Sequence, residues 1–407
     1  MKEICIINYK TNAAMYGIGT YIEEYVYCLN KLDCKINRVE LGTGETKSDF
    51  YVKEDGNIRT IYFPYNQKWN IDNYNKGVCR LIRLYLEDSD NLIFHFQYPE
   101  SDSLLDGIKK YFPLSKSIFT IHYFNWSEVL KGNVALFEKI IRNRENEDTR
   151  KEYGYTIDSF EKEKTFFKKM DRIVCLSDDT MKMTQNLYEI KQNVRLVPNG
   201  LRKNFRKLSE NQKLKLRKKY YIDPVERVLL YVGRIEYTKG IEQVIECFND
   251  VVKEYSNCRL VVIGNGNIIG AIGKCKKAYS KITYTGRLDE KSLCQWYQIS
   301  DIGLFPSFHE QCSFVGIEMM MHGLPIIASD GYGVKNMFQE GVNTKVAKIE
   351  NWEKKSKFRE NLKKSILYVL NSDLLKSELQ KASKKEYKSK YSIERMQKGY
   401  LELLNSL

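Results

Sequence analysis

The residues best suited to chemistry include two glutamates, Glu310 and Glu318, which follow the apolar run Ile302–Phe305. They lie eight residues apart, just over two helical turns, where a turn leads into an apolar segment of helical character. Such a turn can direct both carboxylates into one cleft. The alternative is a buried helix whose carboxylates lie at its solvated edges. Phosphate-suited residues upstream in the chain favour the first interpretation.

Two cations, Arg234 and Lys239, flank a short predicted strand-to-helix turn. Ligands of open α/β sheets bind at the carboxyl ends of the strands, and both side chains can reach that edge. Arginine supplies a bidentate fork and lysine a point charge, a combination that suits a diphosphate. As isolated cations they would be ordinary surface residues, but their position favours phosphate binding.

Two glycine-rich turns offer close approach to a ligand. Gly17 and Gly19 precede a predicted helix, whose N-terminus attracts anions, although an ordinary tight turn would have the same sequence. Gly264, Gly266 and Gly270 follow the strand-like run CRLVVIG. The third glycine comes one position too late for a dinucleotide fingerprint, which argues against a dehydrogenase and favours a turn beside a nucleotide.

His122 stands at the predicted carboxyl end of the strand Ser117–Ile121, just before an aromatic loop. A lone histidine beside apolar residues is most often structural. Its place at a strand end favours a functional role, whereas His95, His309 and His322 are predicted to be structural.

Short apolar runs alternate with longer amphipathic segments, which predicts repeated βα units and parallel sheets. Strands are predicted at 4–8, 58–62, 92–97, 117–122, 172–176, 194–197, 228–232, 260–263, 282–285, 302–305 and 326–328. Helices are predicted at 21–32, 77–86, 240–255, 290–299, 315–321, 357–370 and 393–407. We therefore expect an α/β protein with two Rossmann-like, doubly wound parallel-sheet domains.

A chain of 407 residues is too long for one core and suits two domains. The turn Val197–Gly200 marks the break. We predict an N-terminal Rossmann-like domain at 1–202 and a C-terminal Rossmann-like domain at 203–388. Residues 389–407 should form a C-terminal helix that packs back toward the N-terminal domain.

The chain is basic, with 66 Lys and Arg against 52 Asp and Glu and a formal charge of +14. This favours anionic partners. The densest block, Arg202–Lys219, predicts a solvated linker and helix, with a membrane-surface or acidic-substrate patch as the alternative. No nucleic-acid-binding signature accompanies it, so nucleic acid is not expected as a partner.

Ten scattered cysteines lack metal-ligand spacing with the four histidines, so neither a structural metal nor a bound cofactor is expected. The N-terminal run MKEICIINYK lacks a signal-peptide pattern, and no apolar run is long enough to span a bilayer. We expect a cytoplasmic protein, with peripheral contact at the inner, anionic face of the membrane as an option.

Taken together, these segments resemble the retaining glycosyltransferases of family 4 (glycosyl transferases group 1), which have the GT-B fold. The matching stretches occur in family order over about residues 16–335: YGIGT, strand-end His122, VPNG, GR and KG, LVVIGNG, YTGRL, and the two glutamates leading to GLPIIASD. The resemblance implies two domains that face a central cleft, with the acceptor bound by the N-terminal domain and the nucleotide sugar by the C-terminal domain. It also implies a nucleotide-diphosphate sugar, UDP- or GDP-linked, as co-substrate.

By this resemblance, the catalytic residues are His122, Arg234, Lys239 and Glu310. Arg234 and Lys239 would neutralise the departing diphosphate, while Glu310 and His122 would contact the transferred sugar. Glu318 would accept hydrogen bonds from the ribose hydroxyls. Further donor contacts are implied for Gly17, Gly19, Gly233, Gly264, Arg287, Leu288, Ser313, Phe314 and Val315. Family members generally need no divalent metal.

One departure from the family pattern concerns the donor. Many relatives have EGFG where this chain has Glu310-Gln311-Cys312-Ser313, and the loss of both glycines bears on which sugar is bound. We expect a metal-independent retaining hexosyltransferase that acts on a glycan, lipid-linked or peptide acceptor. The alternatives are a catalytically silent GT-B-like scaffold and a protein that binds anionic surfaces.

Overall fold

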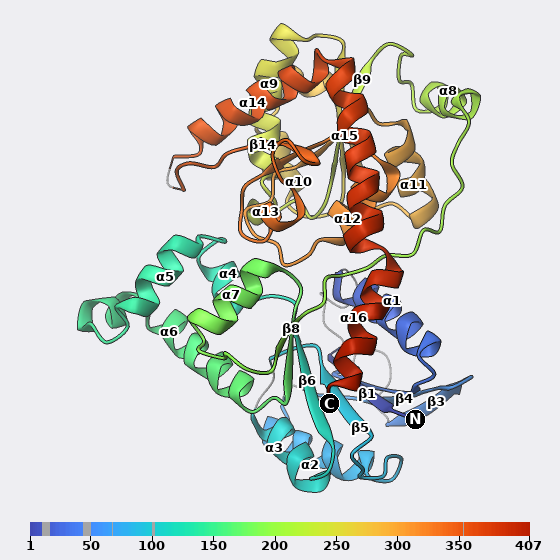
Figure 1. The fold of residues 1–407 in the computed structure, drawn as a ribbon. Coiled ribbons are helices and arrows are strands. Elements are labelled where there is room, and N and C mark those ends of the chain that lie inside the picture. The colour runs from blue at the N-terminus through green and yellow to red at the C-terminus, as the bar shows by residue number, and fades with distance from the viewer. Residues whose placement is uncertain (10–16, 44–49, 67, 100–101, 353) are drawn as a thin grey trace. The chain divides into compact units, whose positions relative to one another are not determined.

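A computed structural model of the chain describes residues 1–9, 17–43, 50–66, 68–99, 102–352 and 354–407. The chain divides into two compact units. The first contains residues 1–125, 138–200 and 393–407, and the second contains 126–137 and 201–392. Both chain termini therefore lie in the first unit (Figure 1). The sequence did not predict that the short segment Trp126–Phe137 would belong with the second unit.

Within the described residues, the first unit is built on an eight-stranded sheet with the order β3-β4-β2-β1-β5-β6-β7-β8. Every neighbouring pair is parallel except β3 and β4. The strands are β1 (Glu3–Tyr9), β2 (Lys35–Leu41), β3 (Tyr51–Asp55), β4 (Ile58–Phe63), β5 (Leu92–Phe96), β6 (Lys116–Ile121), β7 (Arg172–Cys175) and β8 (Val194–Leu196). The helices are α1 (Gly17–Lys31), α2 (Ile71–Ile82), α3 (Asp102–Tyr111), α6 (Glu147–Lys168), α7 (Asp178–Asn186) and α16 (Ile393–Asn405).

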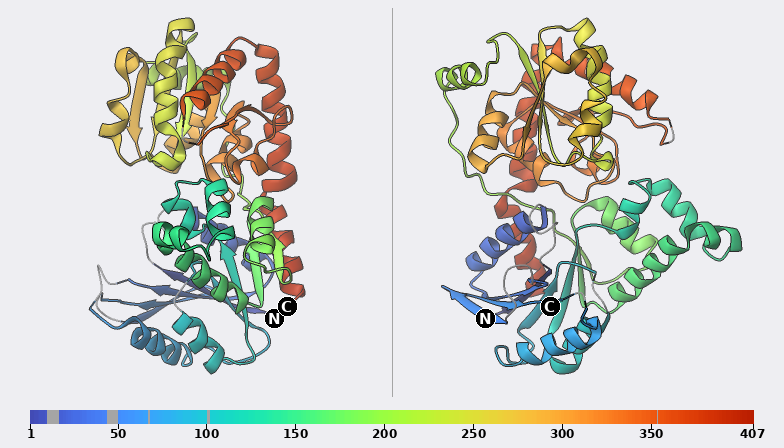
Figure 2. Two further views of the ribbon diagram at one scale, coloured as in Figure 1. Left: turned by 90° about the vertical axis from the view of Figure 1, so that its left-hand side faces the viewer. Right: turned by 180° about the vertical axis from the view of Figure 1, so that it is seen from behind.

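The C-terminal helix α16 lies beside α1, as the red and blue helices in Figure 2 show. Its buried face includes Met396, Tyr400 and Leu403. Gly399 lets α16 approach the chain after β8, since an added Cβ would lie 2.9 Å from Val197 Cγ1. The last residues of the chain thus complete the core of the unit that its first residues begin.

The second unit contains a six-stranded sheet, again counting described residues only, with the order β11-β10-β9-β12-β13-β14 and all pairs parallel. Its strands are β9 (Arg227–Val232), β10 (Cys258–Ile263), β11 (Ile282–Gly286), β12 (Ile302–Phe305), β13 (Ile326–Ser329) and β14 (Thr344–Ala347). Its helices are α8 (Glu210–Lys219), α9 (Ile241–Glu254), α10 (Ile268–Ile272), α11 (Glu290–Ile299), α12 (Phe314–His322), α13 (Val334–Met337), α14 (Ser356–Leu370) and α15 (Asp373–Glu386). Two short helices, α4 (Asn125–Val129) and α5 (Val134–Arg142), each cross one end of the segment Trp126–Phe137.

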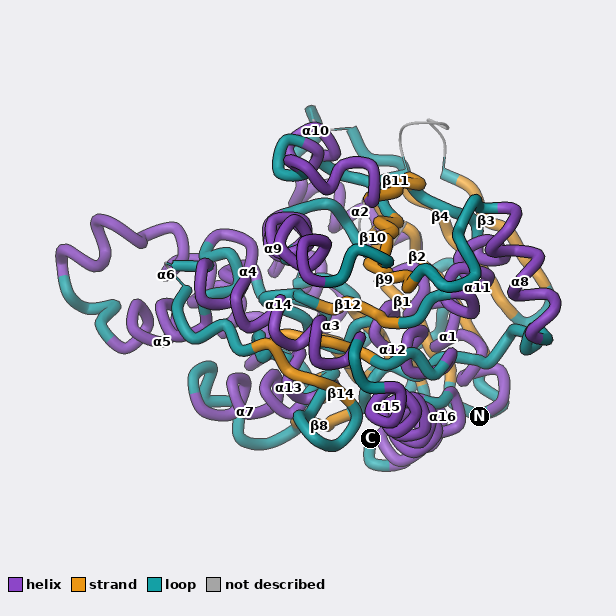
Figure 3. The backbone as a smooth tube through the Cα atoms, turned by 90° about the horizontal axis from the view of Figure 1, so that it is seen from above, coloured by secondary structure: helices purple, strands orange, loops and turns teal. Residues whose placement is uncertain are grey.

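Helices cover both faces of this second sheet, with α9 and α14 on one face and α11 and α12 on the other (Figure 3). The core between the sheet and the first pair is apolar and fully buried, with Leu229, Val262, Phe248 and Leu362 among its members. The predicted class, α/β with two doubly wound parallel-sheet domains, is confirmed.

Three strands were not predicted: β2, β3 and β14. In β3, three of the five residues are charged and exposed, because the strand lies at the edge of its sheet. The edge strand β14 has only four residues, TKVA. Such strands gain their stability from pairing with a neighbour, so they lack the apolar run by which the central strands are recognised.

Candidate active site

The loops that carry the predicted diphosphate residues leave the second sheet at its topological switch point. Strand β9 lies between β10 and β12, so the chain leaves β9 toward one side and β12 toward the other. Ligands of doubly wound sheets bind in the crevice that such a reversal leaves at the carboxyl ends of the strands. Arg234 follows β9, and Glu310 follows β12.

Glycines allow these loops to approach one another. Gly264, after β10, has φ +144°, and an added Cβ would lie 1.9 Å from the carbonyl oxygen of Gly233. Gly240 begins α9 with φ +69°, where a Cβ would lie 2.3 Å from the Pro306 oxygen. Any side chain at either position would force the neighbouring loop away, so the spacing of the site depends on these two residues.

Lys239 and Glu310 form the central ion pair of this edge. Lys239 ends a short 3₁₀ turn, Tyr237–Lys239, and its Nζ donates to Glu310 Oε1 at 2.7 Å. Their side chains are only 19% and 11% exposed, so water screens the pair weakly. The Glu310 backbone is fixed by its N–H, which donates to the Tyr332 oxygen at 2.9 Å. The structure therefore brings together two residues that lie 71 positions apart.

Arg234 differs from Lys239 in its exposure and partner. Its side chain is 53% exposed and pairs with Glu236 at 2.9 Å, a residue that the sequence did not single out. Its carbonyl oxygen accepts from the buried Tyr231 hydroxyl at 2.8 Å, which anchors the loop backbone after Gly233. Arg234 thus has a fixed backbone and an exposed guanidinium.

Glu318 lies in the middle of α12, in agreement with the helix predicted at 315–321. Ser313 caps α12 by accepting from the Gly316 N–H, and Phe314 and Val315 form the first turn. The Tyr297 hydroxyl donates to Glu318 Oε2 at 2.6 Å. Burial raises the pKa of Glu318 to about 7, since desolvation outweighs the hydrogen bond from Tyr297.

The loops after β10 and β11 are joined by one backbone hydrogen bond and one bond from a backbone N–H to a side chain. Gly264 N–H donates to the Gly286 oxygen, and Arg287 N–H donates to Asn265 Oδ1, both at 3.0 Å. Arg287 is exposed and Leu288 is half-buried. The predicted base contacts therefore lie next to the glycine turn after β10.

In the first unit, His122 directly follows β6. Its Nε2 lies 2.9 Å from Gln97 Oε1, and its ring meets the edge of the Tyr21 ring with centroids 4.5 Å apart. Desolvation lowers the pKa of His122 to about 3, so the imidazole is neutral at physiological pH. Gly17 and Gly19 lie in the first turn of α1 itself, not in a loop before it as predicted. Tyr16 of the YGIGT stretch lies outside the described residues.

A buried polar network behind His122 was missed by the sequence reasoning. The Tyr21 hydroxyl lies 3.1 Å from Thr120 Oγ1, which in turn lies 2.8 Å from His95 Nε2. Tyr21 also shares a short hydrogen bond with Tyr400 of α16, 379 residues away. No local pattern pairs residues so far apart, so only the fold reveals this network.

The segment Trp126–Phe137 contacts the loop that carries Glu310. The indole of Trp126 meets the His309 ring edge-on at 5.3 Å, and His309 stacks on Tyr332 at 4.9 Å. Lys131 lies over the Tyr237 ring at 5.1 Å. Trp126 was noticed in the sequence only as part of an aromatic loop after His122.

In the described part of the chain, no group of three or more His, Cys, Asp or Glu side chains is placed to hold a metal ion. Within the same residues, no helix combines the length and the apolar character that crossing a bilayer requires.

Comparison with known proteins gives a family match in the second unit. Residues 212–386 match the family described as glycosyl transferases group 1. Alpha-monoglucosyldiacylglycerol synthase of Streptococcus pneumoniae is 27% identical over 181 residues, which cover 43% of this chain and 41% of that protein. The alignment therefore spans about two fifths of that relative's length.

Solved structures resemble the chain over its whole length. Sucrose-phosphate synthase from Thermosynechococcus elongatus has a TM-score of 0.76 at 16% identity, covering 100% of this chain and 99% of that chain. Anabaena HepE in complex with UDP has a TM-score of 0.70 at 12% identity, covering 100% of both chains. These likenesses establish the GT-B fold, while the cleft expected between the two domains stays a prediction.

Proposed function

Because residues 212–386 match the family of glycosyl transferases group 1, we propose that the chain transfers a sugar from a nucleotide-diphosphate sugar to an acceptor hydroxyl. The donor is UDP- or GDP-linked, and the configuration at the sugar carbon is retained. The ion pair between Lys239 and Glu310 at the carboxyl edge of the second sheet carries this proposal.

The reaction breaks the bond between the anomeric carbon and a phosphate oxygen, and the electron pair leaves with the diphosphate. Lys239 and Arg234 stabilise that negative charge. Fixed cations in a partly desolvated site lower the barrier because they need little reorganisation. In the resting chain Glu310 holds the Lys239 ammonium, and the donor phosphates take over this contact on binding.

Glu318 and Glu310 divide the recognition of the donor. Glu318 accepts hydrogen bonds from the ribose hydroxyls, and its hydrogen bond from Tyr297 holds one carboxylate oxygen in position. Glu310 binds hydroxyls of the sugar and so contributes to the choice of sugar. Neutral His122 contacts the sugar from the first unit. The acceptor hydroxyl attacks the face that the diphosphate leaves and passes its proton to the departing phosphate oxygen, which retains the configuration without an enzyme nucleophile.

The acceptor is a glycan, a lipid-linked sugar or lipid, or a peptide. One similar protein bears the name of a glucosyldiacylglycerol synthase, which supports the lipid option for this chain. We propose that no divalent metal takes part, since the cations of the site are side chains.

The test begins with titration calorimetry of UDP, GDP and ADP. The sugar derivatives of the selected nucleotide are then assayed for hydrolysis and transfer, with and without EDTA. We expect one nucleotide to bind at least tenfold more tightly than the others, turnover that EDTA does not reduce, and an α-linked product from an α-linked donor by NMR. Failure of all three nucleotides to bind, or an inverted product, would refute the proposal.

A further inference from the structure

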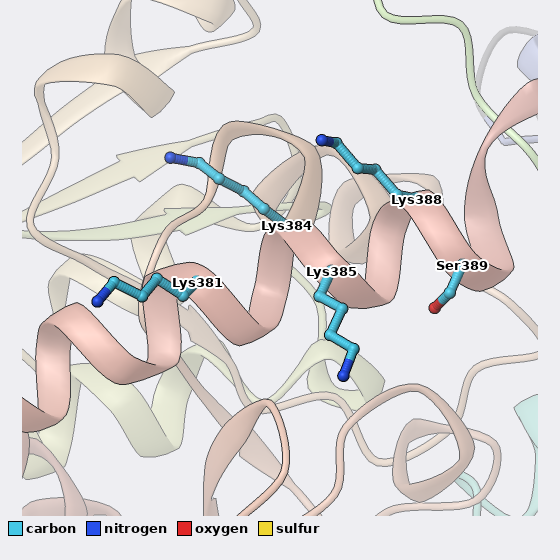
Figure 4. A pocket seen from close by; sticks show the side chains of 5 residues that line it. All are labelled: Lys381, Lys384, Lys385, Lys388 and Ser389. Atoms are coloured by element: carbon cyan, nitrogen blue, oxygen red, sulfur yellow. The ribbon is translucent and has the colours of Figure 1, made fainter.

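Four lysines follow one another along helix α15 and the π-helical segment Tyr387–Tyr391 that continues it, and the fourth, Lys388, belongs to that continuation. Lys381, Lys384, Lys385 and Lys388 have the i, i+3, i+4, i+7 spacing that aligns side chains on a helix, and with Ser389 they line a shallow hollow (Figure 4). Among the described residues, none of the four forms an ion pair with a carboxylate. Their neighbours Lys376 and Lys390 do, with Asp373 and Glu386, both at 2.6 Å.

Further lysines of the second unit lie beside this helix. Burial lowers the pKa of Lys384, and the charges of Lys207, Lys213, Lys203 and Lys388 lower it further. Lys213 is paired with Glu210 at 2.8 Å. We call the remaining set the lysine face: Lys203, Lys207, Lys381, Lys384, Lys385 and Lys388.

Few carboxylates offset this charge. Glu210 and Glu386 are already paired with Lys213 and Lys390. Glu378 is exposed one turn before Lys381 on the same helix. The lysine face therefore keeps an excess of positive charge whose members repel one another, and an external anion would relieve that repulsion.

The helix that carries the lysine face is held firmly. Ser383 Oγ donates to the Leu324 oxygen at 3.0 Å, and the Tyr387 hydroxyl donates to the Leu201 oxygen at 2.9 Å. The stem of Lys384 lies so close to Gly323 that an added Cβ there would meet it at 2.2 Å. Gly323 ends α12, the helix of Glu318, so these lysines belong to the same unit as the candidate donor site.

The amino groups do not converge on one point. Figure 4 shows the four lysine side chains extending in different directions from α15 and the segment that continues it, and all four lysines are exposed. A site for one small phosphate would instead be enclosed by converging donors. Flexible, separated ammonium groups suit an extended anionic surface. Clusters of four to eight lysines on a helix are typical of proteins that contact anionic lipid headgroups.

We propose that the lysine face contacts a bilayer surface that carries anionic lipid headgroups. Single-stranded nucleic acid, the other extended polyanion, is bound through aromatic side chains on which its bases stack, whereas the hollow is lined by four lysines and Ser389. Lipid binding by this face does not depend on glycosyl transfer. If the proposed function also holds, the contact brings the donor-site unit to lipid-linked acceptors.

The test is co-sedimentation of the full chain with phosphatidylcholine vesicles that contain 0% or about 30% phosphatidylglycerol. We expect binding only to the anionic vesicles and a strong loss at high salt, because exposed charges are screened. Each lysine near an anionic surface contributes about fivefold to partitioning. The variant K381Q/K385Q/K388Q should therefore partition roughly 100-fold less. Lys384 is left in place because its stem packs against Gly323.

The matched control is K109Q/K110Q/K162Q, which removes the same charge from exposed positions of α3 and α6 in the first unit. It should lose less than threefold. For both variants, the circular dichroism spectrum and the affinities for UDP and GDP measured by calorimetry should match wild type. A loss of lipid binding can then be told apart from damage to the donor site. Equal loss in the control, unchanged binding of the α15 variant, or tighter binding to single-stranded RNA than to anionic vesicles would overturn the proposal.

Discussion

The ion pair between Lys239 and Glu310 gives the sharpest test of the donor site, because its two members should respond in opposite ways. In the chain without donor, Glu310 accepts a hydrogen bond from the Lys239 ammonium, the group that the donor phosphates would bind. A charge-assisted hydrogen bond contributes about 1.5–3 kcal/mol. In Glu310→Gln that competition is weakened, so the nucleoside diphosphate should bind roughly 10-fold more tightly. Turnover should nevertheless fall, because a contact with the sugar changes.

Lys239→Met should weaken the binding of the nucleoside diphosphate, and it should also reduce turnover. Loss of one fixed charge that stabilises a developing anion costs about 2.7–4 kcal/mol, a factor of about 10² to 10³ in kcat at saturating donor. Glu310, only 11% exposed, is then left without its cation. That should lower the free energy of unfolding by about 1.5–3 kcal/mol. The double variant should recover most of the stability but none of the turnover.

The assays are titration calorimetry with UDP and GDP, steady-state kinetics, and urea unfolding of the two single variants and the double variant. The exposed pair Lys364 and Glu360 on α14 serves as the control, since removing Lys364 should alter neither binding nor turnover. A Lys239→Met enzyme that keeps kcat/KM within threefold of wild type would refute the diphosphate role. A tenfold weaker nucleotide affinity in Glu310→Gln would refute the competition.

Four further predictions concern the framework of the site. Burial raises the pKa of Glu318 to about 7. Between about pH 4.5 and pH 7 the folded chain therefore holds a proton that the unfolded chain releases. The free energy of unfolding falls as pH rises through this range. Glu318→Gln should remove about 3 kcal/mol of that fall, measured by urea unfolding at pH 5 and pH 8, and should weaken nucleotide binding. Burial lowers the pKa of His95 to about 3, so its contribution to the free energy of unfolding is lost as pH falls below about 6.5, at about 1.4 kcal/mol per pH unit. His95→Gln should therefore reduce the loss of stability between about pH 6.5 and pH 3. An unchanged slope of stability against pH would contradict the assignment. Gly240→Ala should cost about 1–3 kcal/mol and reduce turnover, because φ is +69° and the Pro306 oxygen lies where the Cβ would be; a wild-type melting temperature would show that the loop adapts freely. Tyr400→Phe removes the hydroxyl bonded to Tyr21, and we expect a lower kcat with nucleotide affinity unchanged, whereas a pure stability loss would make Tyr400 structural only.

The sequence alone determined the alternation of short apolar strands and amphipathic helices, and with it the two doubly wound sheets. Buried parallel strands are continuous apolar runs, so β9, β10, β12 and β13 are visible without a structure. Parallel strands end at a common edge, so the residues after them, Arg234 and Glu310 included, could be assigned to one region.

The tertiary structure decided which side chains meet. Lys239 pairs with Glu310, Tyr297 with Glu318, and Tyr21 with Tyr400 across 71, 21 and 379 positions. Local periodicity carries no information about such partners, because they depend on strand order and on helix packing. For the same reason, the sequence did not predict the edge strand β14 or the contact of Trp126 with His309. Each is stabilised only by residues that are distant in the sequence and that the fold brings near.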